Sequence, residues 1–224
     1  MKNDSKKPAT LGRIPVSQGE DKYNCILDSA VSLFAIQGIA GTTISQVAQK
    51  AKVTSAMVHY YFQNRDGLVG HVVTERLAPA MTKVWFAVDE TMLIDPAIVI
   101  IQLINSLLDV VEKMPELPLL WNSEILNIGG LLREPFFSII PQHKINNLID
   151  FFNTAQKNGL ITSTIAPNLI FPSIIASIIV PLAAQTLTNK IPMLKIANKK
   201  TLRQHVISLI LNGVLVDNSK REDG

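Results

Sequence analysis

The 224-residue chain carries a net charge of +3, with 47% hydrophobic and 17% charged residues. This composition is too apolar for a disordered chain and supplies enough apolar surface for a packed core. The low numbers of glycine (11) and proline (12) argue against a turn-rich β architecture. The single cysteine, Cys25, excludes an internal disulfide and a metal cluster held by thiolates.

The excess of positive charge lies in the first third of the chain. Residues 1–65 contain eight basic and four acidic side chains, whereas residues 66–224 contain 13 basic and 14 acidic ones. A polyanionic partner for the first third fits this imbalance, although the surplus is too small to establish one alone. Residues 1–18 are polar and basic and contain two prolines, so we expect a flexible arm there. Because this arm has no apolar signal-peptide core, we expect a cytoplasmic protein.

Helix signals begin immediately after the arm. Apolar residues recur at helical spacing from Glu20 to Gln37, and Gly38 supplies a stop. A second helix is predicted over Thr43–Ala51, where Thr43 and Gln46 fit a capping box.

A third short helix follows after a tight connection. Thr54 is a suitable N-cap for a helix that carries Ser55–Phe62. Asn64 is expected to cap a fourth helix, which continues to about Glu90 and has Asp66 in its first turn.

The rest of the chain is a series of long apolar helical stretches separated by proline, glycine or polar clusters. They are predicted at Pro96–Lys113, Leu117–Leu132, Ile139–Asn158, Asn168–Thr188 and Thr201–Val216. The predicted fold class is therefore all-α, with about nine helices.

The stretch Leu169–Ala184 has a rival interpretation, because no charged residue occurs between Asn158 and Asn189. A membrane span needs roughly 20 apolar residues. This stretch is shorter and contains Pro172 and Pro181. A helix that is apolar on every side is more simply explained by burial or by a subunit interface.

Two short helices joined by a tight turn form a helix-turn-helix, whose second helix enters the DNA major groove. Small side chains at Ser55 and Ala56 would let this helix approach base edges, and Met57 offers apolar contact to a thymine methyl. Hydroxyl and guanidinium donors, such as those of Tyr61 and Arg65, suit phosphate oxygens.

The run from Thr42 to Leu68 resembles the N-terminal domain of the tetracycline-repressor (TetR) family. The resemblance rests on Thr42-Thr43-Ile44-Ser45-Gln46-Val47-Ala48, Val53-Thr54, Tyr60-Tyr61-Phe62, Asn64-Arg65 and Leu68, and extends upstream to about Ile26. It implies an all-helical homodimer whose last two long helices pair with the partner subunit, and a small molecule that binds in the core and loosens the grip on DNA. The C-terminal two-thirds resembles the family only in length and helical layout.

The resemblance also implies roles for individual side chains. Phosphate contacts are expected at Thr43, Tyr61 and Arg65, and major-groove contacts at Ser45, Ser55, Ala56, Met57, His59 and Tyr60; Thr54 and Lys52 complete the expected DNA-binding set. Lys52, His59 and Gly67 depart from the family pattern, where a glycine, a tyrosine and an acidic residue are usual. Lys52 is unfavourable there if its φ is positive, but adds a cation beside DNA.

An apolar cavity with a few polar groups is typical of a ligand site. The candidates are the side chains of Trp85, Phe86, Met92, Trp121, Phe136, Phe137, Phe151 and Phe152, with Asn105, Asn122, Glu124, Asn127 and His143 as polar groups. Most of these aromatic residues should be ordinary core. Because the helices carry little charge, we expect an apolar or weakly polar effector.

The predicted organisation is a basic arm (1–18), a helix-turn-helix domain (19–66), a helical ligand-binding and dimerisation domain (67–217) and a polar tail (218–224). The predicted function is a ligand-responsive regulator that binds palindromic operator DNA as a homodimer, and the resemblance to the TetR family implies a repressor rather than an activator. No catalytic motif is found, so we expect neither an enzyme nor a cofactor or metal. A protein-binding helical adaptor and a membrane-associated regulator are the alternatives.

Overall fold

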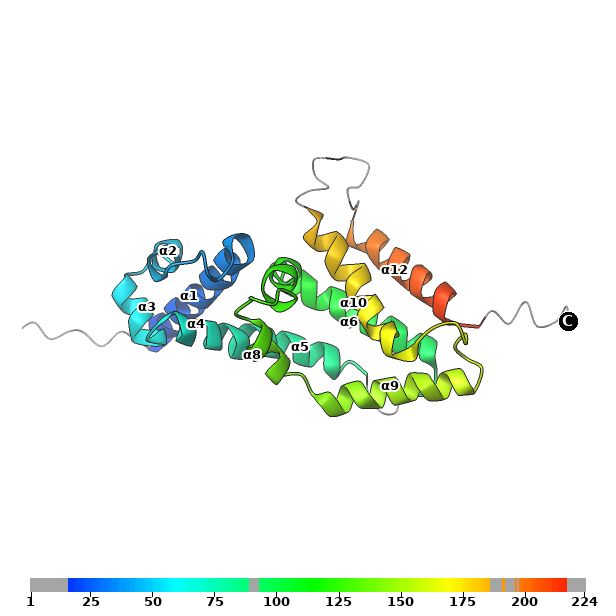
Figure 1. Ribbon diagram of the computed structural model, residues 1–224. Helices are drawn as coiled ribbons and strands as arrows, with labels where there is room; N and C mark the ends of the chain where they lie inside the picture. Colours follow the sequence, from blue (N-terminus) through cyan, green and yellow to red (C-terminus); the bar gives the residue numbers. More distant parts are fainter. Residues whose placement is uncertain (1–15, 89–92, 186–190, 192–195, 197, 217–224) are drawn as a thin grey trace, which may run out of the picture.

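The structure is a computed structural model that describes residues 16–88, 93–185, 191, 196 and 198–216 (Figure 1). These residues form α-helices, two π-helical turns and the connections between them, with one isolated β-bridge between Ile161 and Leu215. The predicted arm, Met92 and the polar tail after residue 217 lie outside the described residues, except that residues 16–18 are helical rather than part of an arm.

The N-terminal domain packs three helices around one apolar core. They are α1 (Val16–Gln37), α2 (Ile44–Lys50) and α3 (Ser55–Phe62), which lie together at one end of the molecule in Figure 1. Its most buried side chains come from all three helices and are Ile26, Phe34, Val47, Val58 and Phe62. The predicted helices are confirmed here, although α1 begins at Val16 rather than at Glu20.

A long helix leads from this domain into the rest of the molecule. It consists of α4 (Arg65–Val72), the π-helical turn η1 (Val73–Leu77) and α5 (Ala78–Trp85). Pro79 has no N–H to donate to the Glu75 carbonyl, and the Arg76 guanidinium donates to that carbonyl instead at 3.2 Å. The predicted extension to about Glu90 is wrong, because the helix ends at Trp85 with Phe86 as its C-cap.

The C-terminal domain is built on four longer helices. They are α6 (Pro96–Lys113), α9 (Gln142–Lys157), α10 (Pro167–Ala183) and α12 (Lys199–Val214). Helix α6 has the predicted bounds and buries a continuous apolar stripe against α5, α10 and α12. Helices α10 and α12 lie side by side on one flank of the domain (Figure 1).

The predicted single helix over Leu117–Leu132 is wrong. The chain instead forms α7 (Leu117–Leu120), the π-helical turn η3 (Trp121–Ile125), a non-helical segment and α8 (Arg133–Ser138). Gly130 explains the break, because a Cβ there would lie 1.9 Å from the Glu124 carbonyl oxygen. Only glycine lets the chain fold back this closely over η3.

Helix α10 and its C-cap, Ala184, contain the apolar stretch Leu169–Ala184, for which a membrane span is the alternative interpretation. Among the described residues, no helix combines the length and the apolar character that crossing a bilayer requires.

Candidate nucleic-acid interface and apolar cavity

Side-chain caps fix the starts of α2 and α3. The Thr43 hydroxyl accepts a hydrogen bond from the Gln46 N–H at 3.2 Å, and the Gln46 side chain accepts one from the Thr43 N–H at 2.8 Å. The Thr54 hydroxyl accepts one from the Met57 N–H at 3.2 Å. The predicted capping box and N-cap are both confirmed, and they define a two-helix unit with a short turn.

The turn between α2 and α3 holds a non-glycine residue in the left-handed region. Lys52 has φ +55°, and the turn is closed by the Val53 N–H, which donates to the Ala48 carbonyl at 2.9 Å. This is the conformation in which a lysine is less favourable than glycine. The exposed Lys52 ammonium therefore extends from a strained turn beside the start of α3.

A second strained turn joins α3 to α4. Gln63 has φ +63° and ψ −59°, and the Asn64 N–H donates to the Phe62 carbonyl at 2.7 Å, which is the geometry of a γ-turn. A Cβ at Gly67 would lie 2.1 Å from the same Phe62 oxygen, so the tight turn requires the glycine that departs from the family pattern. Asn64 caps α4 alone, through a 2.8 Å bond from the Gly67 N–H.

Most predicted DNA-contacting residues lie on the open surface of α2, α3 and the turns around them. The exposed ones are Thr43, Ser45, Lys52, Thr54, Ala56, His59, Tyr60 and Arg65, and the half-buried ones are Ser55, Met57 and Tyr61. Tyr60 is 80% exposed, an unusual state for a large aromatic residue in a helix that is otherwise well packed. Met57 packs partly against the core, which limits its reach.

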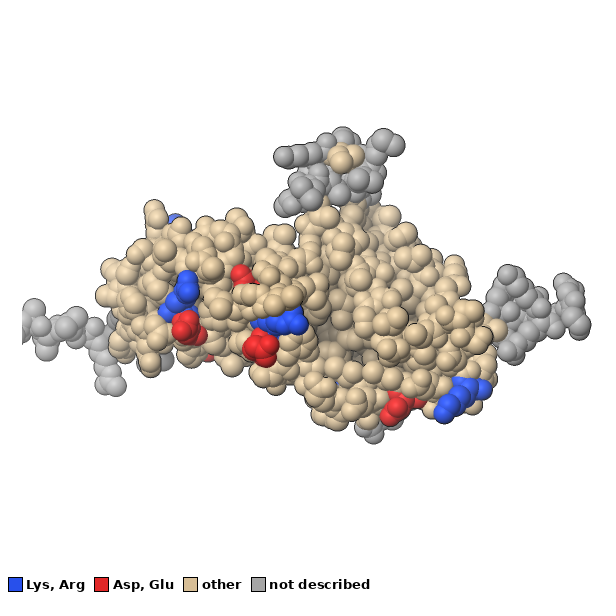
Figure 2. All heavy atoms as spheres, in the orientation of Figure 1, with Lys and Arg blue, Asp and Glu red and all other residues tan. Residues whose placement is uncertain are grey.

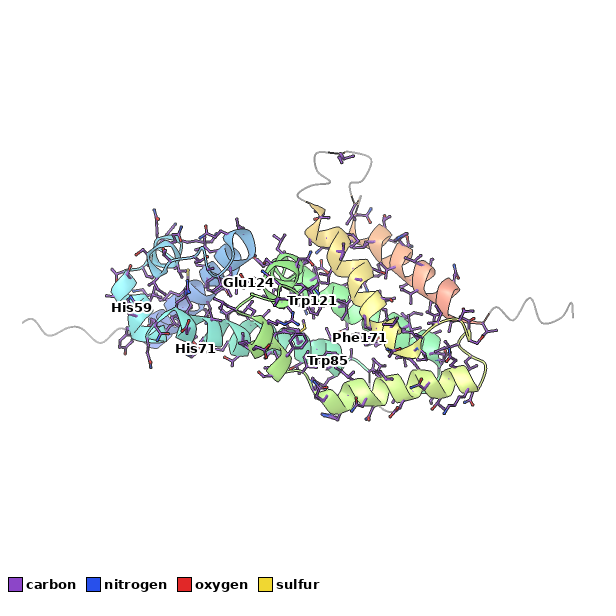
Figure 3. The ribbon with its side chains drawn as sticks, in the orientation of Figure 1. His59, His71, Trp85, Trp121, Glu124 and Phe171 are labelled. Atoms are coloured by element: carbon purple, nitrogen blue, oxygen red, sulfur yellow. The ribbon has the colours of Figure 1, made fainter. Side chains whose placement is uncertain are left out.

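His59 is oriented by its own turn. Its Nδ1 lies 2.8 Å from the Gln63 carbonyl oxygen, and a carbonyl can only accept a hydrogen bond. The Nδ1 atom therefore carries the proton, which leaves Nε2 for contacts outside the domain. Figure 3 shows His59 on α3 at the end of the molecule remote from α10 and α12.

A polar clasp ties α1 to α4 and η1. The Tyr23 hydroxyl lies 2.9 Å from Nδ1 of His71 and donates to the Glu75 carboxylate, which also contacts His71 at 2.9 Å. Burial raises the pKa of Tyr23 to about 12, assisted by the bond to Glu75 and its negative charge. Burial also raises the pKa of Glu75, but its bonds to Tyr23 and His71 and the charges of His71 and Arg76 lower it overall.

The C-terminal domain contains an apolar cavity of about 420 Å³ between α5, η3, α8 and α10. Its described lining holds no charged residue, and the indole N–H groups of Trp85 and Trp121 are its only side-chain hydrogen-bond donors. The lining consists of Met81, Val84, Trp85, Leu107, Trp121, Ile125, Leu126, Phe136, Phe137, Ile140, Ile145, Phe171, Pro172, Ile175, Ala176, Ile179 and Val180. Figure 2 shows the surface hollowed between the parts that α8 and α10 cover.

Four predicted pocket residues line this cavity, namely Trp85, Trp121, Phe136 and Phe137. The others that the structure describes do not. Phe86 is exposed beneath the Lys144 ammonium, and Phe152 is buried in the core beside Phe151. The polar candidates also lie elsewhere: Asn105 binds Arg203, Asn122, Asn127 and His143 are exposed, and Glu124 is buried outside the lining.

Phe171 is the aromatic cavity residue that sequence reasoning missed, beside the twelve non-aromatic residues of the lining. Its ring lies 5.0 Å from that of Trp85, centroid to centroid, and Figure 3 shows both rings near Trp121. It belongs to α10, which was predicted as an interface helix. The all-round apolar character of this stretch allowed for such a role, since a helix that is apolar on every side can line a cavity as well as contact a partner subunit.

A second hollow of about 440 Å³ lies between the two domains, beside η1 and the end of α6. Its wall mixes both signs of charge, with Asp28, Glu75, Arg76 and Lys113 among its members. Arg76 is already occupied, because it donates to Asp28 at 2.7 Å and to Asn24 at 2.8 Å. The 420 Å³ cavity is therefore the better candidate for a ligand site.

Comparison with known proteins identifies the N-terminal domain. Residues 26–72 match the family of bacterial regulatory proteins, tetR family. The probable HTH-type transcriptional regulator YttP of Bacillus subtilis is 42% identical over 50 residues, which cover 22% of this chain and 24% of that protein. The HTH-type transcriptional repressor Rv3405c of Mycobacterium tuberculosis is 35% identical over 77 residues, or 34% and 40% of the two chains. The matches thus span less than half of these relatives.

The fold of the chain as a whole is similar to that of a solved structure. The ketosteroid transcriptional regulator KstR2 of Mycobacterium tuberculosis superimposes with a TM-score of 0.67 at 16% identity, over 92% of this chain and 98% of that one. These relatives are transcriptional regulators and not enzymes. The fold is thus an N-terminal helix-turn-helix domain followed by a helical C-terminal domain. Residues 26–72 thus form an N-terminal domain of the TetR type.

Proposed function

We propose that the chain is a ligand-responsive repressor that binds palindromic operator DNA as a homodimer and is released by a small apolar effector. One observation carries the proposal: the continuous helix from Arg65 to Trp85 begins beside the exposed α3 and ends in the wall of the apolar cavity. An effector that packs against Met81, Val84 or Trp85 can tilt this helix. The tilt would change the distance between the two α3 helices that the subunits of the dimer present to DNA.

The proposed DNA contacts divide into two kinds. Thr43, Tyr61, Lys52 and Arg65 serve the phosphates, which fix the position of the protein but carry little sequence information. Ser55, Ala56, Met57, His59 and Tyr60, with Ser45 and Thr54 at the flanks, serve the major groove. This assignment is supported by the exposure of these residues around α3 and by the TetR-family match over the same segment.

The homodimer is proposed through α10 and α12, within a C-terminal domain that begins near residue 67. The exposed stripe of α10 is uncharged and consists of Leu169, Pro172, Ser173, Ala176 and Val180, of which Pro172, Ala176 and Val180 also line the cavity. The second half of α12 is also uncharged on its exposed side, at Ser208, Leu209, Asn212 and Gly213, whereas its first half exposes Lys199, Lys200 and His205. Figure 2 shows no charged side chain over these helices in that view. A two-fold contact of such faces should bury more than about 1,000 Å². Light scattering at micromolar concentration measures it, and a monomer would rule it out.

The effector is proposed to be uncharged, largely apolar and a hydrogen-bond acceptor rather than a donor. The described lining has no charged group to neutralise a charge on the ligand, and its two indoles can only donate. A volume of about 420 Å³ lies within the range of small-molecule sites. The structural neighbour KstR2 is named a ketosteroid regulator, which fits this chemistry.

The decisive experiment is selection of bound duplexes from random DNA with the full chain. Enrichment of a two-fold symmetric sequence, with affinity that falls steeply as salt rises, is expected. Binding is then repeated with Nile red, an uncharged dye with acceptor atoms and no N–H or O–H donor. No enrichment would favour a protein-binding adaptor, whereas enrichment without any response to ligands would restrict the proposal to DNA binding.

Two variants separate the kinds of contact. Arg65→Ala should weaken binding to all selected duplexes alike and lower the slope of log affinity against log salt by about two, one for each subunit of the dimer. Ser55→Ala should instead alter base preference at one position of each half-site. If both variants had the same sequence-independent effect, the assignment of contacts would be wrong.

A further inference from the structure

The carboxylate of Glu124 is a buried polar group that joins the two domains. Glu124 is 6% exposed, its Oε1 accepts a hydrogen bond from the Ile39 N–H at 2.8 Å, and its Oε2 accepts one from the Leu131 N–H at 2.9 Å. Ile39 lies in the connection between α1 and α2, whereas Leu131 precedes α8. Figure 3 shows Glu124 at the boundary of the domains, with Trp121 beside it.

The neighbours of Glu124 along the chain face the cavity. Trp121 and Ile125 belong to the same π-helical turn, η3, and both line the cavity, while Glu124 between them does not. Single π-helical turns occur frequently at functional sites. One turn of backbone therefore presents two side chains to the cavity and a third to the N-terminal domain.

The surrounding chain is shaped to admit this carboxylate. Gly38 has φ +75°, and a Cβ there would lie 3.2 Å from Oε1 of Glu124. Gly130 lets the backbone pass directly over the Glu124 carbonyl, which brings the Leu131 N–H to Oε2. The carboxylate is thus held from both sides by backbone donors, and its position is tied to that of η3.

We propose that Glu124 is the positioning residue that transmits occupation of the cavity to the DNA-binding domain, through its hydrogen bond to the Ile39 N–H. The proposal rests on the proposed function, since it assigns a route to the same cavity and the same DNA-binding surface. An occupant that displaces Trp121 or Ile125 moves η3 and carries Glu124 with it. Because Ile39 lies in the turn that leads from α1 into α2, its movement shifts α2 and α3 against the long helix.

Coupling between two sites is a ratio of affinities, and that ratio separates transmission from mere support. Operator affinity is measured for the wild type with and without saturating Nile red, and Nile red affinity is measured on free protein. The wild-type ratio is expected between roughly 5- and 150-fold. Glu124→Ala should bring it to within about twofold of one while the affinity for Nile red changes by less than about threefold.

Two further variants refine the comparison. Glu124→Gln has one acceptor oxygen instead of two, so it can keep only one of the two N–H bonds, and an intermediate ratio is expected. Glu134→Ala on the adjacent α8 removes an exposed carboxylate and should leave the ratio unchanged. If Glu124→Ala lowers both affinities but keeps the ratio, Glu124 is a structural residue only and the proposal is overturned.

A second arm needs no ligand, so it also works if Nile red does not bind. Ile175→Trp places extra volume in the cavity, and hydrogen exchange is followed at the Ile39 amide. The proposal expects faster exchange at Ile39 in Ile175→Trp than in wild type, and no further change when Glu124→Ala is added. Unchanged exchange at Ile39 in Ile175→Trp would overturn the link. Absence of Nile red binding with a changed Ile39 would instead count against the proposed effector chemistry.

Discussion

The two domains of this chain are stabilised in different ways. In the N-terminal domain, side-chain caps begin each of the short helices α2, α3 and α4, and a polar clasp of Tyr23, His71 and Glu75 joins α1 to α4 and η1. In the C-terminal domain Asp95 and Asn198 cap α6 and α12, but α9 and α10 begin without a side-chain cap, and the long helices pack through apolar faces around a cavity of about 420 Å³. The first arrangement fixes the geometry of a surface, whereas the second tolerates movement around an internal space.

The largest effect expected from this comparison is loss of the N-terminal core. Phe34 is fully buried, and Phe34→Ala should cost about 3–5 kcal/mol of unfolding free energy, because it removes a large side chain and leaves a void. DNA binding should be lost, while Nile red binding should survive. Chemical denaturation followed by circular dichroism, beside dye fluorescence, measures both. Equal loss of the two activities would show that the domains unfold as one unit.

The caps offer the next largest effect. Thr54→Ala removes the acceptor for the Met57 N–H and should destabilise the N-terminal domain by about 1 kcal/mol. Thr54→Ser keeps an acceptor and is the matched control. The measurement is the denaturation midpoint of the domain. A loss of equal size in Thr54→Ser would mean that the methyl group, and not the cap, stabilises α3.

Lys52 has opposite effects on stability and on DNA affinity, because its positive φ costs free energy of folding while its charge favours binding to DNA. Lys52→Gly relieves a positive φ but adds freedom to the unfolded chain, so a gain below about 1 kcal/mol is expected. Operator binding should weaken, since each subunit of the dimer loses an exposed cation, and its salt slope should fall by about two. Lys50→Ala at the end of α2 removes a cation without a positive φ. A slope that falls equally in both variants would show that position 52 has no special place at the DNA.

The smallest effect concerns the pH range over which the clasp holds. The pKa of Glu75 is lower in the folded protein than its ordinary value of 4.5. Its contribution to the free energy of unfolding is therefore fully present above about pH 4.5 and is lost as the pH falls through the pKa of the folded state. Tyr23 has a raised pKa, so its contribution is present below 10.0 and is lost as the pH rises through about 12. The difference in stability between wild type and Tyr23→Phe should therefore be largest between these limits. Ultraviolet titration of tyrosinate in the two proteins checks the Tyr23 value.

The comparison also explains what could be read from the sequence. Thr43, Thr54 and Asn64 act on N–H groups three residues away, so their roles follow from local spacing alone. The break after η3 depends on Gly130 approaching a carbonyl six residues earlier, and a helical pattern does not reveal it. The partner of Glu124 is a backbone group 85 positions away, which no spacing rule predicts. Four of the seventeen residues of the cavity wall were predicted, because tryptophan and phenylalanine are conspicuous, whereas most of the remainder resembled ordinary core.

The π-helical turn η1 has a consequence for the phase of the long helix. A π turn holds one residue more than the α turn that it replaces, and one residue corresponds to about 100° of rotation in an α-helix. Met81, Val84 and Trp85, which follow η1, point into the cavity because the π turn absorbs this extra residue. If all five residues of 73–77 became regular α-helix, this wall would rotate by about 100° away from the cavity, whereas deletion of one of them would restore a regular helix and keep the wall in place. A segment that contributes nothing to the described lining thus determines which face of α5 the cavity meets.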